Sequence, residues 1–449
     1  MSRKRECILF CLFIMITMLI FSVTVQGMSL DHESPFIPLE MNVLDNGMRV
    51  IVREIPEYPT VAVNIWVGAG GRHDPEGKSG LAHFFEHMLF QGTETRTGID
   101  ISREIEAAGG SLNALTGLEY TAYYIMVPSN NFDRAIKIQA DMVKNSNYPQ
   151  QNLDYERGVI EQEIRDRNSS PQTALRDAAR QKLFASTPYE RPVLGSVEDV
   201  NDITREDMFA FHEKYYVPNN MTLVVVGDVE ADYVFEKAEK YYGEMEGKRT
   251  PQQSSVLIPE LEEKQEIELE RDVEHSSLLI AFPGPGIGEP ETVALEMGGI
   301  ILGSGRSSRL YQILREEKEL VTSVSAGYSD YSEIGQFWIM ARMPEKNMDE
   351  VEKIIRDEIE KLQEEKVTEE ELERARAMVR SSFSFQAESN INLALTLGIM
   401  KTQATVQDAI NIINVMETVT ADDIQNAVQR YLDPEIYLRG RLDPKGGNN

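Results

Sequence analysis

The chain has 449 residues, with 45 Lys and Arg against 74 Asp and Glu, a formal net charge of −29, and 41% hydrophobic residues. This length exceeds one ordinary hydrophobic core, so two or more domains are expected, and the apolar fraction excludes a disordered or low-complexity protein. The acidic balance argues against nucleic-acid binding, which needs clustered Lys and Arg, and against adhesion to anionic membrane surfaces.

Residues 1–27 have the pattern of a secretory signal peptide. A basic tripeptide at 3–5 precedes an uncharged, mainly apolar run over 8–25, and residues 25–27 (VQG) suit a signal peptidase. We therefore expect export to a periplasmic or extracellular location. The run is also about as long as the roughly 17–25 residues of a membrane span, so an uncleaved anchor is the alternative. Such an anchor would be the only attachment to a membrane that the sequence predicts.

Both cysteines of the chain, Cys7 and Cys11, lie inside this segment. Cleavage would leave a chain without thiols. Disulfides, Cys-ligated zinc and Cys nucleophiles are then excluded from the mature protein.

The N-terminal domain is expected over residues 36–245 and alternates strand and helix patterns. Asn46-Gly47 between two strand-like runs predicts a tight hairpin, and residues 61–67 (VAVNIWV) predict the next strand. A helix over 80–90 follows a glycine-rich turn. The remaining predicted elements are helices over 101–108, 130–145, 151–167, 172–185, 204–215 and up to 242, and strands over 113–127 and 223–228.

A polar segment with two prolines, residues 246–262, predicts a linker to a second domain over 263–443. The second domain repeats the order of the first. Its predicted elements are strands over 277–282, 322–328 and 335–343 and helices over 292–302, 307–310, 347–364 and 368–384.

Local similarity between the halves indicates a duplication. The run YYIMVP at 123–128 resembles FWIMARMP at 337–344, and Glu156-Arg157 resembles Glu373-Arg374, at an offset of about 217 residues. The predicted fold class is therefore α+β, with two duplicated domains that are each an antiparallel sheet with helices packed on one face.

The strongest chemical signal is His83-Phe84-Phe85-Glu86-His87. On a helix the two histidines lie one turn apart, so both imidazoles can reach one metal ion, while Glu86 lies beside that face. This is the inverted form of the zinc-protease helix motif. A chance match is improbable in a chain with six histidines. The alternative is a pair of core or surface histidines with an unrelated glutamate.

A catalytic zinc site needs a third protein ligand and an open position. Three carboxylates of the predicted helix 151–167 are candidates, namely Glu156, Glu161 and Glu163. Glu156 and Glu163 are seven residues apart and share a helix face, whereas Glu161 points elsewhere. Without the histidine motif, a solvated helix face would be the better interpretation of these glutamates.

Four segments together resemble the pitrilysin/insulinase family of zinc peptidases (inverzincins), especially half-size members similar to the β subunit of mitochondrial processing peptidase. They are GLAHFFEHMLFQGT at 80–93, GGSLNALT at 109–116, ERGVIEQEI at 156–164 and YYVPNNMTLVVVGD at 215–228. The resemblance covers nearly all of residues 40–440. It implies a zinc metalloendopeptidase that hydrolyses peptides or unfolded segments.

The resemblance also implies roles for individual residues. It makes His83, His87 and Glu163 the ligands of one zinc ion per chain. Glu86 becomes the general base of the reaction and Glu156 a supporting carboxylate at the catalytic site. An extended peptide substrate would be bound by strand addition to an edge strand formed by Asn113, Ala114, Leu115 and Thr116.

The sequence departs from the family pattern in its second half. Where the family has an Arg and, seven residues later, a Tyr that contact substrate and oxyanion, this chain has Arg315 and Thr322. Ala294 and Gly298 stand roughly where a second metal motif would lie, so this half is a degenerate repeat without zinc ligands. The resemblance then favours a heterodimer, in which a related zinc-less subunit supplies the Arg/Tyr pair, over a homodimer.

The sequence also supports one alternative function and one substrate preference. A non-catalytic scaffold or assembly subunit of the same family is the alternative to an enzyme, although such members usually lose part of the metal motif. The acidic balance of the chain suggests a preference for cationic peptides.

Overall fold

The computed structural model describes residues 38–248, 250, 255–403 and 414–446. The chain divides into two units, Met1–Pro35 and Phe36–Asn449, and the second contains all described residues. The predicted signal segment, residues 1–27, lies outside them. In the part of the chain that is described, no helix has the length and apolar character needed to cross a membrane. Of the predicted linker 246–262, residues 255–260 have no regular secondary structure, and residues 249 and 251–254 lie outside the description.

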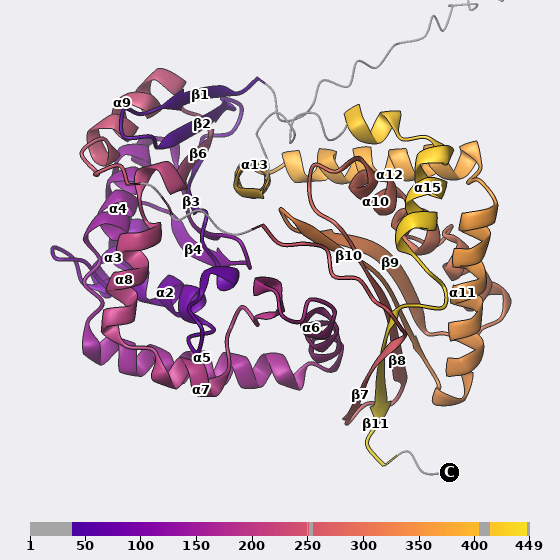
Figure 1. The fold of residues 1–449 in the computed structure, drawn as a ribbon. Coiled ribbons are helices and arrows are strands. Elements are labelled where there is room, and N and C mark those ends of the chain that lie inside the picture. Colours follow the sequence, from indigo (N-terminus) through magenta and orange to yellow (C-terminus); the bar gives the residue numbers. More distant parts are fainter. Residues whose placement is uncertain (1–37, 249, 251–254, 404–413, 447–449) are drawn as a thin grey trace, which may run out of the picture. The chain divides into compact units, whose positions relative to one another are not determined.

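The N-terminal half contains a six-stranded sheet with the strand order β1-β2-β6-β3-β5-β4 (Figure 1). All neighbouring strands are antiparallel except β2 and β6, which are parallel. The predicted hairpin joins β1 to β2, and Gly47 in its turn has a φ of +90° that glycine adopts without strain. The strands are β1 Glu40–Val43, β2 Arg49–Glu54, β3 Thr60–Val67, β4 Ser111–Thr116, β5 Thr121–Pro128 and β6 Met221–Gly227.

Most helices of this half pack on one face of the sheet. Alternate strand residues such as Val63 and Ile65 contact Phe84 and Ile136 of the helices in one hydrophobic core. The helices are α2 Leu81–Leu89, α3 Gly98–Ala107, α4 Phe132–Asn145, α5 Gln150–Ser169, α6 Pro171–Leu183, α7 Val197–Asp202, α8 Arg205–Tyr215 and α9 Ala231–Tyr242. Short 3₁₀ helices cover Gly71–His73, Ser129–Asn131, Pro188–Glu190 and Pro218–Asn220.

The C-terminal half contains a five-stranded sheet with the strand order β7-β11-β8-β10-β9, in which only β11 and β7 are parallel. Its strands are β7 Gln265–Arg271, β8 Ser276–Pro285, β9 Ser323–Asp330, β10 Ile334–Met343 and β11 Leu438–Pro444. Its helices are α10 Pro290–Gly303, a π-helical segment Tyr311–Glu317, the 3₁₀ helix Glu345–Asn347, α11 Met348–Glu364, α12 Glu369–Ala387, α13 Asn390–Gln403 and α15 Ala421–Tyr431.

Each half donates one helix to the other half's sheet. Helix α13 of the second half packs on β3 and β6, where Leu393 and Leu397 contact Trp66. Helix α6 of the first half packs on β8 and β11, where Leu175 contacts Leu279. Residues on the second face of each sheet are therefore buried as well, which agrees with strands that are apolar on both faces.

The predicted α+β fold with two similar halves is confirmed, with two differences. Each sheet contains one parallel pair, because β6 and β11 return beside an early strand after a long helical excursion. Helices cover both faces of each sheet and not one, because of the exchange of α6 and α13. The elements β7, β11, α7, α13 and α15 were not predicted, and the helix expected over 307–310 starts at Arg309 and continues as the π-helical segment.

Candidate metal centre

Helix α2 is held firmly at its N-terminus. Gly80 precedes the helix with a φ of +94°, and a Cβ at this position would lie 2.5 Å from the carbonyl oxygen of Leu194. The buried carboxylate of Asp74 accepts hydrogen bonds from the backbone N–H groups of Gly80 at 2.7 Å and Ala82 at 2.9 Å. Burial raises the pKa of Asp74 to about 8, although these two hydrogen bonds act in the opposite direction. They satisfy N–H groups that have no partner within the helix. Phe84 and Phe85 are fully buried, so the helix presents a fixed face to β4 and α5.

The structure brings His83, His87 and Glu163 together. The two imidazole rings lie 4.8 Å apart between centroids. Oε2 of Glu163, on α5, lies 3.6 Å from Nε2 of each histidine. All three candidate ligand atoms are within 4.8 Å of one another, and in the described ranges no other group of three His, Cys, Asp or Glu side chains converges in this way.

This donor set fits a zinc ion. Two imidazole nitrogens and one carboxylate oxygen are the ligands of an open catalytic zinc site. Burial, with smaller contributions from His87 and Arg167, lowers the pKa of His83 to about 3, so its imidazole is neutral. Burial alone would also lower the pKa of His87, but Glu156, Glu86 and Glu163 together raise it above its ordinary value. The surrounding carboxylates thus favour a cation at this place.

Glu156 orients one of the imidazoles. Its Oε2 lies 3.0 Å from Nδ1 of His87, which leaves Nε2 of His87 for the metal. Its other oxygen accepts a hydrogen bond from Nε2 of Gln91 at 2.8 Å, and Gln91 is in turn held by Asn152 at 2.8 Å. Glu156 is therefore buried and hydrogen-bonded, although the sequence alone would assign its helix face to solvent.

Glu86 lies beside the ligands and is bonded to the edge strand. Its Oε2 accepts a hydrogen bond from Oγ1 of Thr116 at 2.5 Å. Its side chain is buried, and burial together with the charge of Glu163 raises its pKa. Strand β4, which carries Thr116, is the outermost strand of its sheet as predicted, so one of its sides has no partner strand among the described residues.

A cavity of about 430 Å³ surrounds these groups. Its walls are His83, Glu86, His87, Phe90, Gln91, Asn113, Ala114, Leu115, Thr116, Glu156, Glu163 and Leu194. Every site residue proposed from the sequence lies here except Arg315. Gln91 and Leu194 were not anticipated, nor was the apolar Phe90. The spacing of Gln91, one helical turn after His87, was the available signal for the first, whereas Leu194 is distant in sequence and had none.

Arg315 and Thr322 have local contacts instead. The guanidinium of Arg315, in the π-helical segment, donates to the carbonyl oxygen of Val321 at 3.1 Å. Oγ1 of the exposed Thr322 donates to the carbonyl oxygen of Arg342 at 3.0 Å. Neither residue lines the metal cavity.

Comparison with known proteins identifies the family of this chain. Residues 49–197 match the insulinase family (peptidase family M16), and residues 202–379 match the peptidase M16 inactive domain. An uncharacterized zinc protease of Rickettsia felis is 32% identical over 391 residues, which cover 86% of this chain and 93% of the relative. One from Mycobacterium bovis is 30% identical over 411 residues, covering 90% and 92%. The chain therefore belongs to the insulinase family, peptidase family M16.

Solved structures confirm the fold. A protease from Helicobacter pylori superposes with a TM-score of 0.83 at 23% identity and covers 91% of this chain and 99% of its own. Pitrilysin superposes with a TM-score of 0.79 at 20% identity, and the match covers 92% of this chain but 45% of pitrilysin. The chain thus matches a half-size member of the family.

Proposed function

We propose that the protein is a zinc-dependent endopeptidase that hydrolyses peptide bonds in peptides or unfolded segments. The observation that carries this proposal is the convergence of His83, His87 and Glu163 with Glu86 beside them in one cavity. The names of the relatives, which describe zinc proteases, support a metallopeptidase of this kind.

Each polar side chain of the cavity has a task in such a reaction. A bound zinc ion would supply an electrophile that acidifies water and polarises a carbonyl group. Thr116 fixes Oε2 of Glu86, and Oε1 of Glu86 has no hydrogen-bond partner among the described residues, so this oxygen can take a proton from water and return it to the leaving amine. Glu156 keeps His87 in the orientation that a metal ligand needs.

The edge strand would hold the substrate. Main-chain groups on the outer side of β4 can pair with an extended peptide, which gives affinity without demanding one sequence. Because Thr116 ends this strand and contacts Glu86, a peptide paired with residues 113–116 would pass directly over the general base.

Two substitutions separate metal binding from catalysis. Glu163→Gln should lose the zinc, and Glu86→Gln should keep about one zinc per chain yet lose hydrolysis of a fluorogenic peptide. Glu161→Gln is the matched control, because it removes the same charge from the same helix while its partners are Arg165 and Asn201. Zinc is measured by mass spectrometry on protein dialysed against metal-free buffer. Wild-type hydrolysis by the Glu86→Gln variant would refute the role of Glu86.

We also propose that a related subunit without zinc ligands completes the site as a heterodimer, with a homodimer as the alternative. The contacts of Arg315 and the threonine at position 322 support this, since neither supplies an oxyanion donor to the metal cavity. Co-purification from the native host should recover a related chain that carries an Arg and a Tyr seven residues apart. Recovery of this chain alone would contradict the proposal.

Finally, we propose that residues 1–27 direct the protein across the membrane and are removed. The basic tripeptide, the apolar run and the small residues after it support this. Cell fractionation followed by N-terminal sequencing should find the protein outside the cytoplasm with a new terminus near residue 28. A full-length chain in the membrane fraction would identify the segment as an anchor instead.

A further inference from the structure

A second cavity of about 530 Å³ adjoins the metal cavity. Leu194 lines both cavities, which places them side by side. On α5 the metal ligand Glu163 lines the first cavity, and Arg167, one helical turn or about 6 Å further along, lines the second. The second cavity therefore begins within one turn of the site where hydrolysis is proposed.

The edge strand leads from one cavity into the other. Residues 113–116 of β4 line the metal cavity, and residues 117–120, the turn that follows, line the second. An extended peptide advances about 3.3 Å per residue. A peptide paired with β4 would thus bring a side chain that lies one to three residues from the scissile bond into the second cavity.

Two guanidinium groups of this cavity have no carboxylate partner among the described residues. Of the three arginines in its walls, Arg167 is paired with Asp177 through two hydrogen bonds of 2.7 and 3.0 Å. Arg180, on α6, donates to the carbonyl oxygen of Tyr189, and no ion pair is found for it among the described residues. Arg176, one turn before Arg180, is exposed and has neither a hydrogen bond nor an ion pair in the described part of the chain.

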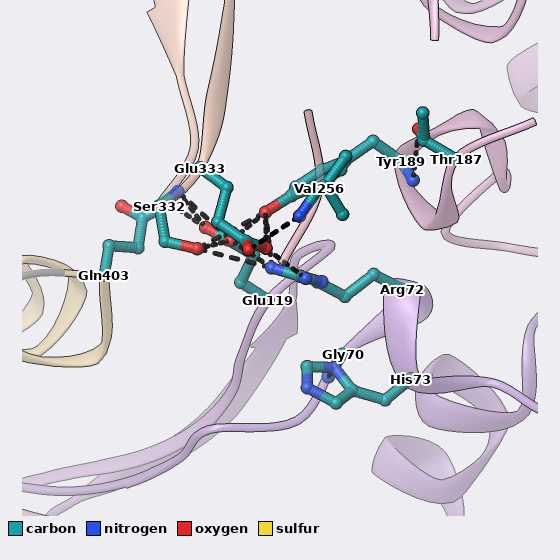
Figure 2. A network of polar contacts seen from close by, with 10 residues as sticks. All are labelled: Gly70, Arg72, His73, Glu119, Thr187, Tyr189, Val256, Ser332, Glu333 and Gln403. Carbon is teal, nitrogen blue, oxygen red and sulfur yellow. Dashed lines mark hydrogen bonds and ion pairs between the residues drawn. The ribbon is translucent and has the colours of Figure 1, made fainter. Parts of the chain in front are cut away.

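The acidic groups in the walls are mostly engaged. Figure 2 shows Glu119 at the centre of a buried network, where it accepts hydrogen bonds from Arg72 at 2.9 Å, Tyr189 at 2.7 Å and Gln403 at 2.9 Å. Asp177 is occupied by Arg167. Asp330 is the one carboxylate in the walls that remains against the two guanidinium groups of Arg176 and Arg180, and burial, reinforced by the charge of Glu119, raises its pKa. Positive charge is therefore in excess here, in a chain whose net charge is −29.

We propose that this cavity is a substrate subsite in which Arg176 and Arg180 bind a carboxylate located within three residues of the scissile bond. The carboxylate is that of an Asp or Glu side chain, or the free C-terminus of a short peptide. A guanidinium presents a planar fork of N–H donors that suits a carboxylate. This subsite rests on the proposed peptidase function, and it gives a preference opposite to the one suggested by the net charge of the chain.

Matched peptides test the subsite by cleavage. A fluorogenic peptide with blocked ends carries Glu, Gln or Lys at each of the three positions on either side of the scissile bond, and one further Gln peptide has a free C-terminal carboxylate. At one of these positions the wild type should cleave the Glu peptide with a kcat/KM about fivefold above that of the Gln peptide, with Lys lowest. A gain for the free C-terminus alone would identify that carboxylate as the ligand.

Charge reversal then assigns the effect to Arg176. In Arg176→Glu the order of the Glu and Lys peptides should invert, because the substitution reverses the charge that faces the peptide. Arg176 has no hydrogen bond or ion pair among the described residues, so its loss should not disturb the fold. Arg180→Lys, which keeps the charge but not the fork, should lower the Glu over Gln ratio while the melting temperature reports the fold. Arg134→Glu on the exposed side of α4 is the matched control and should leave the wild-type ratio unchanged. An unchanged ratio in Arg176→Glu, or a wild-type preference for Lys, would overturn the subsite.

Binding provides a readout that does not need hydrolysis. Fluorescence anisotropy of the same peptides on the Glu86→Gln variant should give a Kd for the Glu peptide about fivefold below that of the Gln peptide, and 0.5 M salt should reduce the difference. If the wild type cleaves none of the peptides but this difference is present, the proposed catalysis fails and the subsite stands. If cleavage occurs and the Kd values are equal, the subsite fails and the catalysis stands.

Discussion

Gly398→Ala tests the packing of the exchanged helix α13. A Cβ at position 398 would lie 1.9 Å from Cε2 and 2.0 Å from Nε1 of Trp66, a fully buried ring of β3. No real Cβ is found so close to another atom, so either the ring or the helix must move. Overpacking of a core typically costs about 1–3 kcal/mol, whereas Ala exceeds Gly in helix propensity by about 1 kcal/mol. The net expectation is a loss of up to about 2 kcal/mol in the free energy of unfolding.

Gly158→Ala is the matched control, because it makes the same change in α5. A Cβ there meets nothing within 4 Å, so helix propensity alone should act, with a gain of about 0.5–1 kcal/mol. Both variants are measured by urea unfolding monitored by tryptophan fluorescence and circular dichroism. The two substitutions should shift the unfolding midpoint in opposite directions at equal m-values. An equal or greater stability of Gly398→Ala compared with Gly158→Ala would refute the packing of α13 against Trp66.

Three further predictions concern charge and metal. Arg72→Met leaves the buried carboxylate of Glu119 without its cation and should lower the free energy of unfolding by about 3–5 kcal/mol in urea titrations, and adding Glu119→Gln should restore part of the loss. Burial alone would raise the pKa of Glu371, but its two hydrogen bonds from Arg309 lower it to about 2. The wild type should therefore be more stable than Glu371→Gln by about 1–2 kcal/mol at pH 7, after allowance for solvent screening. Because the pKa is depressed in the folded state, this difference should shrink as the pH falls from about 5 towards 2. A difference that stays constant over this range would contradict the prediction. Chelation of zinc should lower the melting temperature of the wild type but not of Glu163→Gln, as calorimetry would show.

The sequence predicted that His83 and His87 lie close together on one helix, because this information is local. Two histidines one turn apart on a helix face one ion whatever the rest of the fold does, and α2 places them so. The third candidate ligand could not be assigned from local spacing. Spacing left Glu156 and Glu163 on the same face of α5, and the choice of Glu163 needed a family resemblance. In the structure, Glu163 lies near Nε2 of both histidines, whereas Glu156 lies near Nδ1 of His87.

What the sequence could not predict depends on contacts between distant segments. The run INLALTLGIM of α13 is apolar on most sides, but nothing in it shows that Trp66 and Val224 of the first half form its partner surface. The local hydrogen bonds of Arg315 and Thr322 could not be predicted from the sequence either. Arg315 matches the family pattern, but Thr322 stands where the family has Tyr. The carbonyl oxygen that each side chain binds is determined by the folded loop and not by the spacing.

The exchange of α6 and α13 connects folding to the proposed substrate site. Helix α6 carries Arg176 and Arg180 into the second cavity while its apolar face packs on β8 and β11 of the other half. Helix α13 packs on the sheet that contains β4 and ends at Gln403, which donates to Glu119 in the wall of the same cavity. Each half thus supplies an apolar surface that the other needs and a polar group to the shared cavity. The C-terminal half therefore has a use that requires no metal ligands, because without it the first half would keep His83, His87 and Glu163 but lose the surface that positions α6 and the cavity beside them.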